Sequence, residues 1–391
     1  MMPLKRVLLV LIALWNSGCG STTHEEPSRT EIASDAEAAI ASAKREQPPF
    51  EEFAGTEACR DCHEEVFQSY LKTGHAQTLR HAYEVPFLQG LDGHQFVDEL
   101  RGVTLHYHVS GERIEVSIPE RFGDDRFELQ YALGSGAHGI TCLTLLPDVA
   151  GGTLGIEHRL TWYESDKKFR LTPGHRNLEA VQDSEMFGRI VHRDLVGRCV
   201  SCHATTSRIE NEEIVDLIPH VGCESCHGPG RAHIRAVNEG KPDLAIKFVA
   251  DSWTPEDEIT VCAECHRSEH EIPDEVIRTD ELRIVRFQSV GLTQSRCYTE
   301  SAKAFSCATC HNPHHKPGDR SGTAYEAVCI DCHDGRTERE TPEVRCRVSP
   351  EEGCIKCHMP PVEILPGVHF ADHWIRIRER DDERLRALDQ R

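Results

Sequence analysis

The sequence Cys-x-x-Cys-His occurs seven times in this chain of 391 residues, and the repeat constrains the fold more than any other feature. Within each copy the two cysteines and the histidine stand at positions i, i+3 and i+4, which share one face of a helical turn. Two thiols and an imidazole on one face can hold a single porphyrin, through two thioether bonds and one bond to iron. The repeat therefore predicts seven covalent haem c groups, whose sites we number 1 to 7 in chain order. The cysteines are Cys59 and Cys62, Cys199 and Cys202, Cys223 and Cys226, Cys262 and Cys265, Cys307 and Cys310, Cys329 and Cys332, and Cys354 and Cys357; the histidines are His63, His203, His227, His266, His311, His333 and His358.

The paired cysteines fit haem attachment better than chance, zinc binding or thioredoxin-like chemistry. With 18 Cys and 24 His in the chain, chance would supply roughly 0.05 copies of the motif. A tetrahedral zinc site would need two Cys-x-x-Cys pairs and would not explain a histidine after every pair. Thioredoxin-like redox chemistry predicts one such pair in a βαβ context rather than seven.

Residues 1–19 have the pattern of a lipoprotein-type signal peptide. Lys5 and Arg6 precede an apolar run over residues 7–15, which is too short to span a bilayer. The small residues before Cys19 resemble a bacterial lipobox, so we expect lipidation at Cys19, with plain signal-peptide cleavage as the alternative. Either route delivers the chain to the periplasm, and the first anchors it to the membrane through lipid.

The composition favours a haem-filled protein that docks to other redox proteins. Only 38% of the residues are hydrophobic and 6% are aromatic, which is little for a core of this size unless porphyrins add apolar surface. The net charge of −21 argues against a nucleic-acid partner. It suits redox partner proteins that present basic docking patches.

The spacing of the motifs divides the chain. Residues 20–52 carry few large apolar groups and are expected to form a flexible tether. A helical segment around site 1 is expected over 53–92, a six-haem region over 176–376 and a charged helix over 377–391. Residues 93–175 lack the motif and alternate apolar with polar residues, which predicts a small antiparallel β insertion between sites 1 and 2. The predicted fold class is mainly α with much irregular loop, as a multihaem cytochrome c fold that holds this insertion.

Several strings outside the seven motifs resemble one family, that of the bacterial multihaem cytochromes c related to cytochrome c-554, an electron carrier of nitrifiers. The resemblance extends over residues 55–376. The wider group includes pentahaem nitrite reductases, which usually mark the catalytic haem with Cys-x-x-Cys-Lys, and octahaem hydroxylamine oxidoreductases; this chain has no Cys-x-x-Cys-Lys. The resemblance implies a multihaem fold and electron transfer. The strings are GSGAH at 134–138, EHRLTWY at 157–163, CESCHGPGRAH at 223–233, SCATCHNPH at 306–314, CHMP at 357–360 and FADH at 370–373.

Seven more histidines are needed if every iron has two histidine ligands. His75, His233 and His314 resemble ligands of the family. Each of them follows a motif too closely to reach over the same ring easily, so we expect it to serve a neighbouring haem. The predicted set is completed by His138, His192, His369 and His373, with His175, His220 and His270 in reserve.

Three further cysteines lie outside the motifs and the signal peptide. Cys142 falls on a predicted strand, where a buried thiol acts as a small hydrophobic side chain. Cys297 and Cys346 flank the stretch that holds sites 5 and 6. In an oxidising compartment these two residues could form a disulfide.

Three functions remain open at this point. The leading hypothesis is electron transfer between redox partners through closely packed bis-histidine haems, without a substrate reaction. The alternative is a multihaem enzyme that acts on a small nitrogen or sulfur compound at one five-coordinate haem, flanked by His175, His220, Arg176 or Arg231. A third hypothesis is a structural or adhesion module. The spin state of the oxidised irons separates the first two, because a five-coordinate haem is high-spin.

Overall fold

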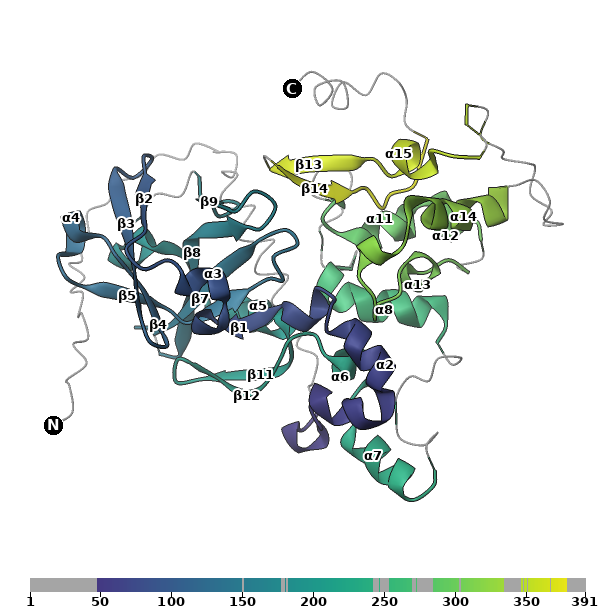
Figure 1. The fold of residues 1–391 in the computed structure, drawn as a ribbon, viewed down its shortest axis with the longest axis horizontal. Helices are drawn as coiled ribbons and strands as arrows, with labels where there is room; N and C mark the ends of the chain where they lie inside the picture. The colour runs from purple at the N-terminus through teal and green to yellow at the C-terminus, as the bar shows by residue number, and fades with distance from the viewer. Residues whose placement is uncertain are drawn as a thin grey trace, which may run out of the picture.

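The computed structural model describes residues 48–149, 151–176, 180, 182–241, 246, 253–268, 272, 284–301, 304–333, 346, 348–349, 351–365 and 367–377. About 38% of these residues are helical and 27% lie in strands. Most of the strands form one body on the left of Figure 1, and the helices that carry most of the motifs lie on the right.

Two antiparallel sheets make up the β body, residues 79–191. One sheet has the strand order β2-β3-β4-β5, and the other has the order β1-β6-β7-β8-β10, with β9 paired to β8. Apolar side chains on alternate positions of these strands, such as Leu105, Ile114 and Leu160, pack into one shared core. The strands are β1 (Leu79–His81), β2 (Gln95–Asp98), β3 (Val103–Ser110), β4 (Arg113–Ser117), β5 (Arg126–Leu129), β6 (Tyr131–Leu133), β7 (Ile140–Pro147), β8 (Thr153–Tyr163), β9 (Lys168–Leu171) and β10 (Gly188–Val191).

A second apolar cluster holds helix α5 (Arg193–His203) against the six-stranded sheet. Val196 and Val200 of α5 pack on Leu143 and Leu145 of β7. Gly155 of β8 permits the close approach, because a Cβ there would come within 2.9 Å of a Val196 methyl carbon. Since α5 ends in the motif of site 2, this packing fixes site 2 on the β body.

The helical part consists of short elements joined by irregular chain. Helix α8 packs against α11 and α13, and α14 packs against α15. The α-helices are α2 (Arg60–Tyr70), α3 (Pro86–Gln89), α4 (Pro119–Phe122), α6 (Cys223–His227), α7 (Arg231–Asn238), α8 (Pro255–His266), α11 (Gln288–Gln294), α12 (Arg296–Thr299), α13 (Cys307–Cys310), α14 (Gly322–His333) and α15 (Cys354–His358). The 3-10 helices are η1 (Phe50–Glu52), η2 (Thr56–Cys59), η3 (His75–Gln77), η4 (Ala82–Glu84), η5 (Asp183–Met186) and η7 (Pro317–Asp319).

The predicted fold class, mainly α with a small β insertion, was wrong. Strands lie on both sides of residues 93–175: β1 precedes them and β10 follows them. Two hairpins also lie in the region expected to be helical, formed by β11 (Ala204–Glu210) with β12 (Glu213–Pro219) and by β13 (Pro361–Leu365) with β14 (Val368–Ala371). The motifs demand only one helical turn each, so seven of them do not make a mainly α protein.

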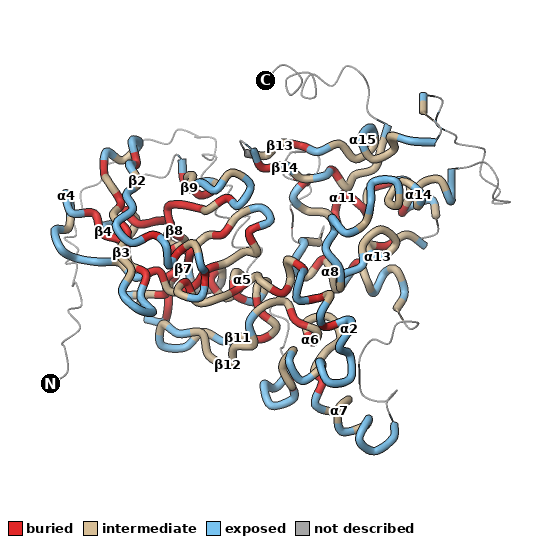
Figure 2. Tube along the Cα trace, in the orientation of Figure 1, coloured by how far each residue is buried: buried red, intermediate tan, exposed pale blue. Residues whose placement is uncertain are grey.

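Burial is uneven between the two parts. Figure 2 shows the buried stretches concentrated in the β body, whereas the helical part is mostly intermediate or exposed. The two apolar clusters of the helical part are small: Ile259, Leu292 and Tyr298 form one, and Ile272, Ile284 and Val290 form the other. Among the described residues, the polypeptide therefore supplies little core around most of the motifs.

Some of the sequence-based expectations lie outside the described residues. These are the signal peptide with Cys19, the reserve ligand His270, most of the tether and nearly all of the C-terminal helix. Of the tether, only its last residues are described, and they contain η1. Within the described ranges, every helix is too short or too polar to span a bilayer.

Candidate haem sites

All seven motifs lie on or beside a helix. Site 1 runs from η2 into α2, and site 5 occupies α13 with its histidine directly after the helix end. The motifs of sites 2, 3, 4, 6 and 7 form the last turns of α5, α6, α8, α14 and α15, each of which ends at the motif histidine. The thiols and the imidazole of each site therefore come from one helical turn or its immediate continuation, as attachment to one porphyrin requires.

Several motif imidazoles are held through one ring nitrogen. His203 Nδ1 lies 3.0 Å from the Thr78 carbonyl oxygen. His358 Nδ1 lies 3.1 Å from the Arg376 carbonyl oxygen, and His266 Nδ1 lies 3.2 Å from an amide oxygen, Gln288 Oε1. A hydrogen bond at Nδ1 fixes the ring and leaves Nε2 as the nitrogen that can bind a metal.

Three motif histidines face a second histidine from another part of the chain. The ring centroids of His227 and His314 are 6.1 Å apart with an interplanar angle of 7°. Those of His266 and His75 are 6.3 Å apart at 69°. At site 5, the rings of His311 and His373 are 6.2 Å apart at 35°.

The spacing of these pairs fits one iron between the rings. An imidazole nitrogen binds a first-row metal at about 2.0–2.1 Å, so two rings on opposite sides of one iron have centroids about 6.3 Å apart. Two of the three partner rings are also oriented by backbone carbonyls, His373 by that of Ala371 at 3.0 Å and His75 by that of Pro313. Burial lowers the pKa of His373 to about 4, which keeps its imidazole in the neutral form that binds metals.

The other predicted distal histidines are placed differently. His233 lies half-buried on α7, and its Nδ1 has no hydrogen-bond partner. His138 stacks on Phe370 of β14 with centroids 4.2 Å apart. His192 precedes α5 and His369 lies on β14, both exposed. Within the described ranges, none of these four rings faces a motif histidine.

The two described reserve histidines lie near the β body. His175 is fully buried, with Nε2 3.1 Å from a Glu157 carboxylate oxygen and no partner for Nδ1. His220 adopts a left-handed backbone conformation, with φ of +67°, and its Nδ1 accepts a hydrogen bond from the Leu79 N–H at 3.5 Å. Neither ring faces a motif histidine in the described part of the chain.

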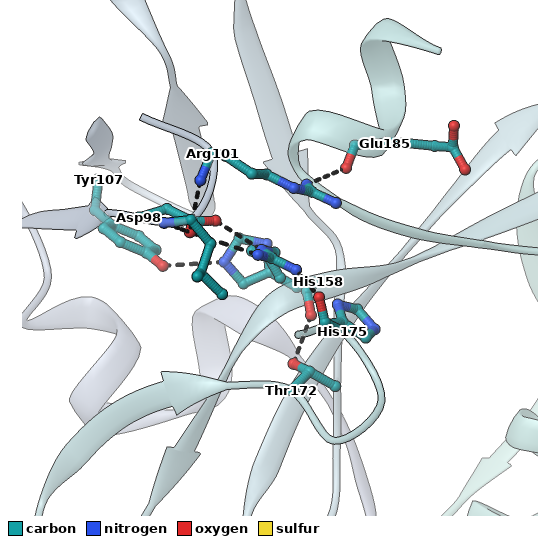
Figure 3. A network of polar contacts seen from close by, with 9 residues as sticks. Asp98, Arg101, Tyr107, His158, Thr172, His175 and Glu185 are labelled. Atoms are coloured by element: carbon teal, nitrogen blue, oxygen red, sulfur yellow. Dashed lines mark hydrogen bonds and ion pairs between the residues drawn. The ribbon is translucent and has the colours of Figure 1, made fainter. Parts of the chain in front are cut away.

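A polar network in the β body was not anticipated from the sequence (Figure 3). Arg159 is fully buried; its Nε donates to Asp98 Oδ2 at 2.7 Å, and its Nη1 donates to the His175 carbonyl. Nearby, the Tyr107 hydroxyl lies 3.0 Å from His158 Nε2. Burial lowers the pKa of His158 to about 3, so this imidazole is neutral in the folded protein. The run Glu157-His158-Arg159, three ionisable residues inside an alternating strand, is the signal that could have revealed it.

This network extends to site 2. Glu157 accepts hydrogen bonds from Arg189 Nη2 at 2.8 Å and from Arg189 Nε at 3.1 Å, in addition to its contact with His175. Both Glu157 and Arg189 lie within electrostatic reach of Cys199, the first cysteine of site 2. An acid, a base and a cation therefore stand beside one haem-attachment helix.

The three described cysteines outside the motifs form no disulfide in this structure. Cys142 is buried in the β-body core, as predicted, and burial raises its pKa to about 12. Cys297 and Cys346 are both free in this structure, so the disulfide between them stays a prediction.

Comparison with known proteins agrees with the motifs. The family model for cytochrome c554 and c-prime matches residues 161–228, which contain sites 2 and 3. Among solved structures, the outer cell wall cytochrome OcwA is similar over 83% of this chain and 80% of its own, with 15% identity and a TM-score of 0.47. No curated protein matches the chain. The family match confirms the resemblance to the cytochrome c-554 family, and with the repeated motif it supports a multihaem c-type cytochrome, a class that binds haem c covalently.

Proposed function

We propose that the protein carries seven covalent haems and passes electrons between redox partners through closely packed bis-histidine irons. The observation that carries this proposal is the set of three facing histidine pairs, each of which leaves the space of one iron between its rings. When bound, haem supplies the one-electron chemistry. An iron with imidazole on both sides has no position free for substrate, so the chain's own residues position, bury and tune each haem.

The facing pairs support a proposed second ligand at each of three sites. His314 would complete site 3, His75 would complete site 4 and His373 would complete site 5. For site 1 the best candidate is His233. Its helix α7 lies beside the N-terminal segment that leads into site 1, because Arg231 Nε donates to the Phe53 carbonyl at 2.5 Å. A buried Nδ1 without a partner is consistent with a ring whose other contacts are completed by a haem.

The same proposal includes the location and the partners. A lipid on Cys19 would anchor the protein to the membrane on the periplasmic side. Around site 1 the side chains of Glu57, Asp61, Glu64 and Glu65 are exposed, which supports docking of a partner with a basic patch. Arg60 pairs with Glu57 at 2.5 Å and offsets only part of this charge.

One observation favours the alternative of an enzyme that acts on a small nitrogen or sulfur compound. Within the described residues, His203 of site 2 faces no second histidine, and the Glu157–His175–Arg189 cluster lies near that site. An acid-base pair and a cation beside an open iron position could bind an anion and move a proton. Site 2 is therefore where we would look for a five-coordinate haem.

Two measurements on the holoprotein test the proposal. Intact mass should show seven haems per chain, and a mass that corresponds to five or fewer would contradict the count. The electron paramagnetic resonance (EPR) spectrum of the oxidised protein should be entirely low-spin. One high-spin iron together with rapid turnover of nitrite or hydroxylamine would establish the enzyme instead.

A matched pair of variants tests the ligands. His314→Ala should open one axial position at site 3 and convert one of the seven irons to high-spin, with the haem count by mass unchanged. His315→Ala removes the next residue, whose side chain is exposed, and should leave the spectrum as in the wild type. A low-spin spectrum in His314→Ala would show that His314 is not a ligand.

A further inference from the structure

Thiols from different motifs meet in four places. Cys59 lies near Cys223, Cys202 near Cys265, Cys262 near Cys307, and Cys329 near Cys354, and the elements of three of these pairs pack together, α6 with η2, α13 with α8 and α14 with α15. In every case the two partners hold the same position in their motifs, first with first or second with second. These contacts connect site 1 with site 3, site 2 with site 4, site 4 with site 5, and site 6 with site 7.

Two further pairs of neighbouring cysteines connect the sites that these four pairs leave unconnected. Cys226 of site 3 lies within electrostatic reach of Cys262 and Glu264 on α8, the helix of site 4. Cys310 of site 5 lies near Cys329 of site 6, and α13 packs against α14. Sites 3 and 4 are therefore neighbours, and so are sites 5 and 6.

Backbone and side-chain contacts outside the cysteines agree with these pairings. On α8, Glu258 accepts hydrogen bonds from the hydroxyl of Ser306 and from the N–H of Ala308, both at the start of the site 5 motif. The Cys202 thiol donates to the Glu264 carbonyl at 3.8 Å, which joins site 2 to the helix of site 4. In Figure 1 the helices follow one another from α2 and α6 past α8 and α13 to α14 and α15.

A motif cysteine reports where the edge of its haem lies. Thioether attachment places the sulfur on a substituent of the porphyrin edge, so two sulfurs in contact bring two porphyrin edges within a few atoms of each other. Electron tunnelling falls steeply with edge-to-edge distance. The order in which motif thiols neighbour one another would therefore indicate the order in which electrons pass between the attached haems.

We propose that the seven haems form one branched path with site 4 as its junction. One arm runs through site 3 to site 1, a second runs through sites 5 and 6 to site 7, and a short branch ends at site 2. The proposal rests on the seven haems of the proposed function. The arm of sites 5, 6 and 7 lies outside the segment matched by the family model.

The proposed path has two long arms, and partners would exchange electrons at the end of each arm. Cys62 and His63 of site 1 are exposed, as are Cys332 and His333 of site 6 and Cys357 of site 7. At the junction, Cys265 and His266 are also exposed, but His266 faces His75 and a haem between them would cover both. In each step one iron(II) is oxidised and the next iron(III) is reduced. A protein donor at one end supplies the electron, and a protein acceptor at the other end removes it.

Iron positions in the holoprotein test this order. Anomalous diffraction at the iron edge, or electron cryomicroscopy, would locate each iron and assign it to its motif through the attached cysteines. We expect the site 4 haem to have three close neighbours, from sites 2, 3 and 5, and the site 7 haem to have only that of site 6. Seven irons with site 5 away from site 4, or site 7 next to site 1, would overturn the path and leave the proposed function standing. Fewer than seven irons would contradict the proposed function instead.

Discussion

Acidification should destabilise the β body through His158. This imidazole is fully buried next to Tyr107, and burial lowers its pKa from 6.5 to about 3. In the unfolded chain the same group takes up a proton as the pH falls below 6.5. The unfolded state therefore binds more protons between pH 6.5 and 3, and the free energy of unfolding must fall as the pH falls through that window.

The size of the effect follows from one proton. Each pH unit well inside the window costs about 1.4 kcal/mol per proton, so the His158 contribution should drop by about 2.7 kcal/mol between pH 7.5 and 4.5. The His175 pKa is also lowered by burial, despite its hydrogen bond to Glu157, and this residue adds a loss of the same sign. A variant is needed to separate the two.

The assay compares guanidinium unfolding midpoints, followed by far-ultraviolet circular dichroism, at several pH values. His158→Gln should lower stability at pH 7.5 but flatten the pH dependence, since it removes the titrating group and keeps a polar side chain near Tyr107. His94→Gln, at an exposed position between α3 and β2, should retain the full slope of the wild type. Equal slopes in His158→Gln and the wild type would refute the reasoning.

Arg159→Met should cost about 3–5 kcal/mol of unfolding free energy, because Asp98 would keep a buried charge without its partner; adding Asp98→Leu should recover part of that loss in the same unfolding assay. Electron transfer to a basic partner should slow as ionic strength rises, and Glu64→Gln with Glu65→Gln should weaken that salt dependence in stopped-flow traces more than Glu112→Gln does. Cys19→Ser should move the protein from the membrane fraction to the soluble periplasmic fraction; a wild type that is already soluble would contradict the lipid anchor. The chain made without haem attachment should keep amide protection in the β body and lose it in α8 and α14, as hydrogen exchange would measure.

The motif helices were predictable because the chemistry sets the spacing. Two sulfurs and a nitrogen must reach one porphyrin, and only a helical turn presents i, i+3 and i+4 on one face. The distal histidines were harder, because each comes from a segment distant in sequence. His314 was expected from its string and lies opposite His227, whereas His369 and His192 lie outside the family strings, were added to complete the set of seven, and are exposed.

The prediction of the fold class was wrong because the haem motifs do not determine the structure of the chain between them. Alternation over residues 103–118 correctly indicated strands, but β10 to β12 lie next to or after the site 2 helix, where the motif density suggested helices. The buried polar network was not predicted from the sequence for a related reason. Arg159 and His158 interrupt an apolar pattern, and only the folded sheets bring Asp98, sixty-one positions away from Arg159, to pair with the guanidinium.

The β body and the helical part are stabilised by different contacts, and this difference is relevant to function. The β body buries its own apolar side chains and an Arg159–Asp98 ion pair, so its core is formed by the polypeptide itself. Around most of the motifs the core formed by the described residues is thin, and in the proposed holoprotein the porphyrins would supply contacts that hold α8, α13, α14 and α15 together. Site 2 joins the two, because α5 is packed on the rigid sheet and its Cys202 contacts Cys265 of site 4. A haem at site 2 of the proposed path would therefore be attached to the β body. The Glu157–His175 pair lies beside that helix, so a haem there would have a group able to accept a proton next to it.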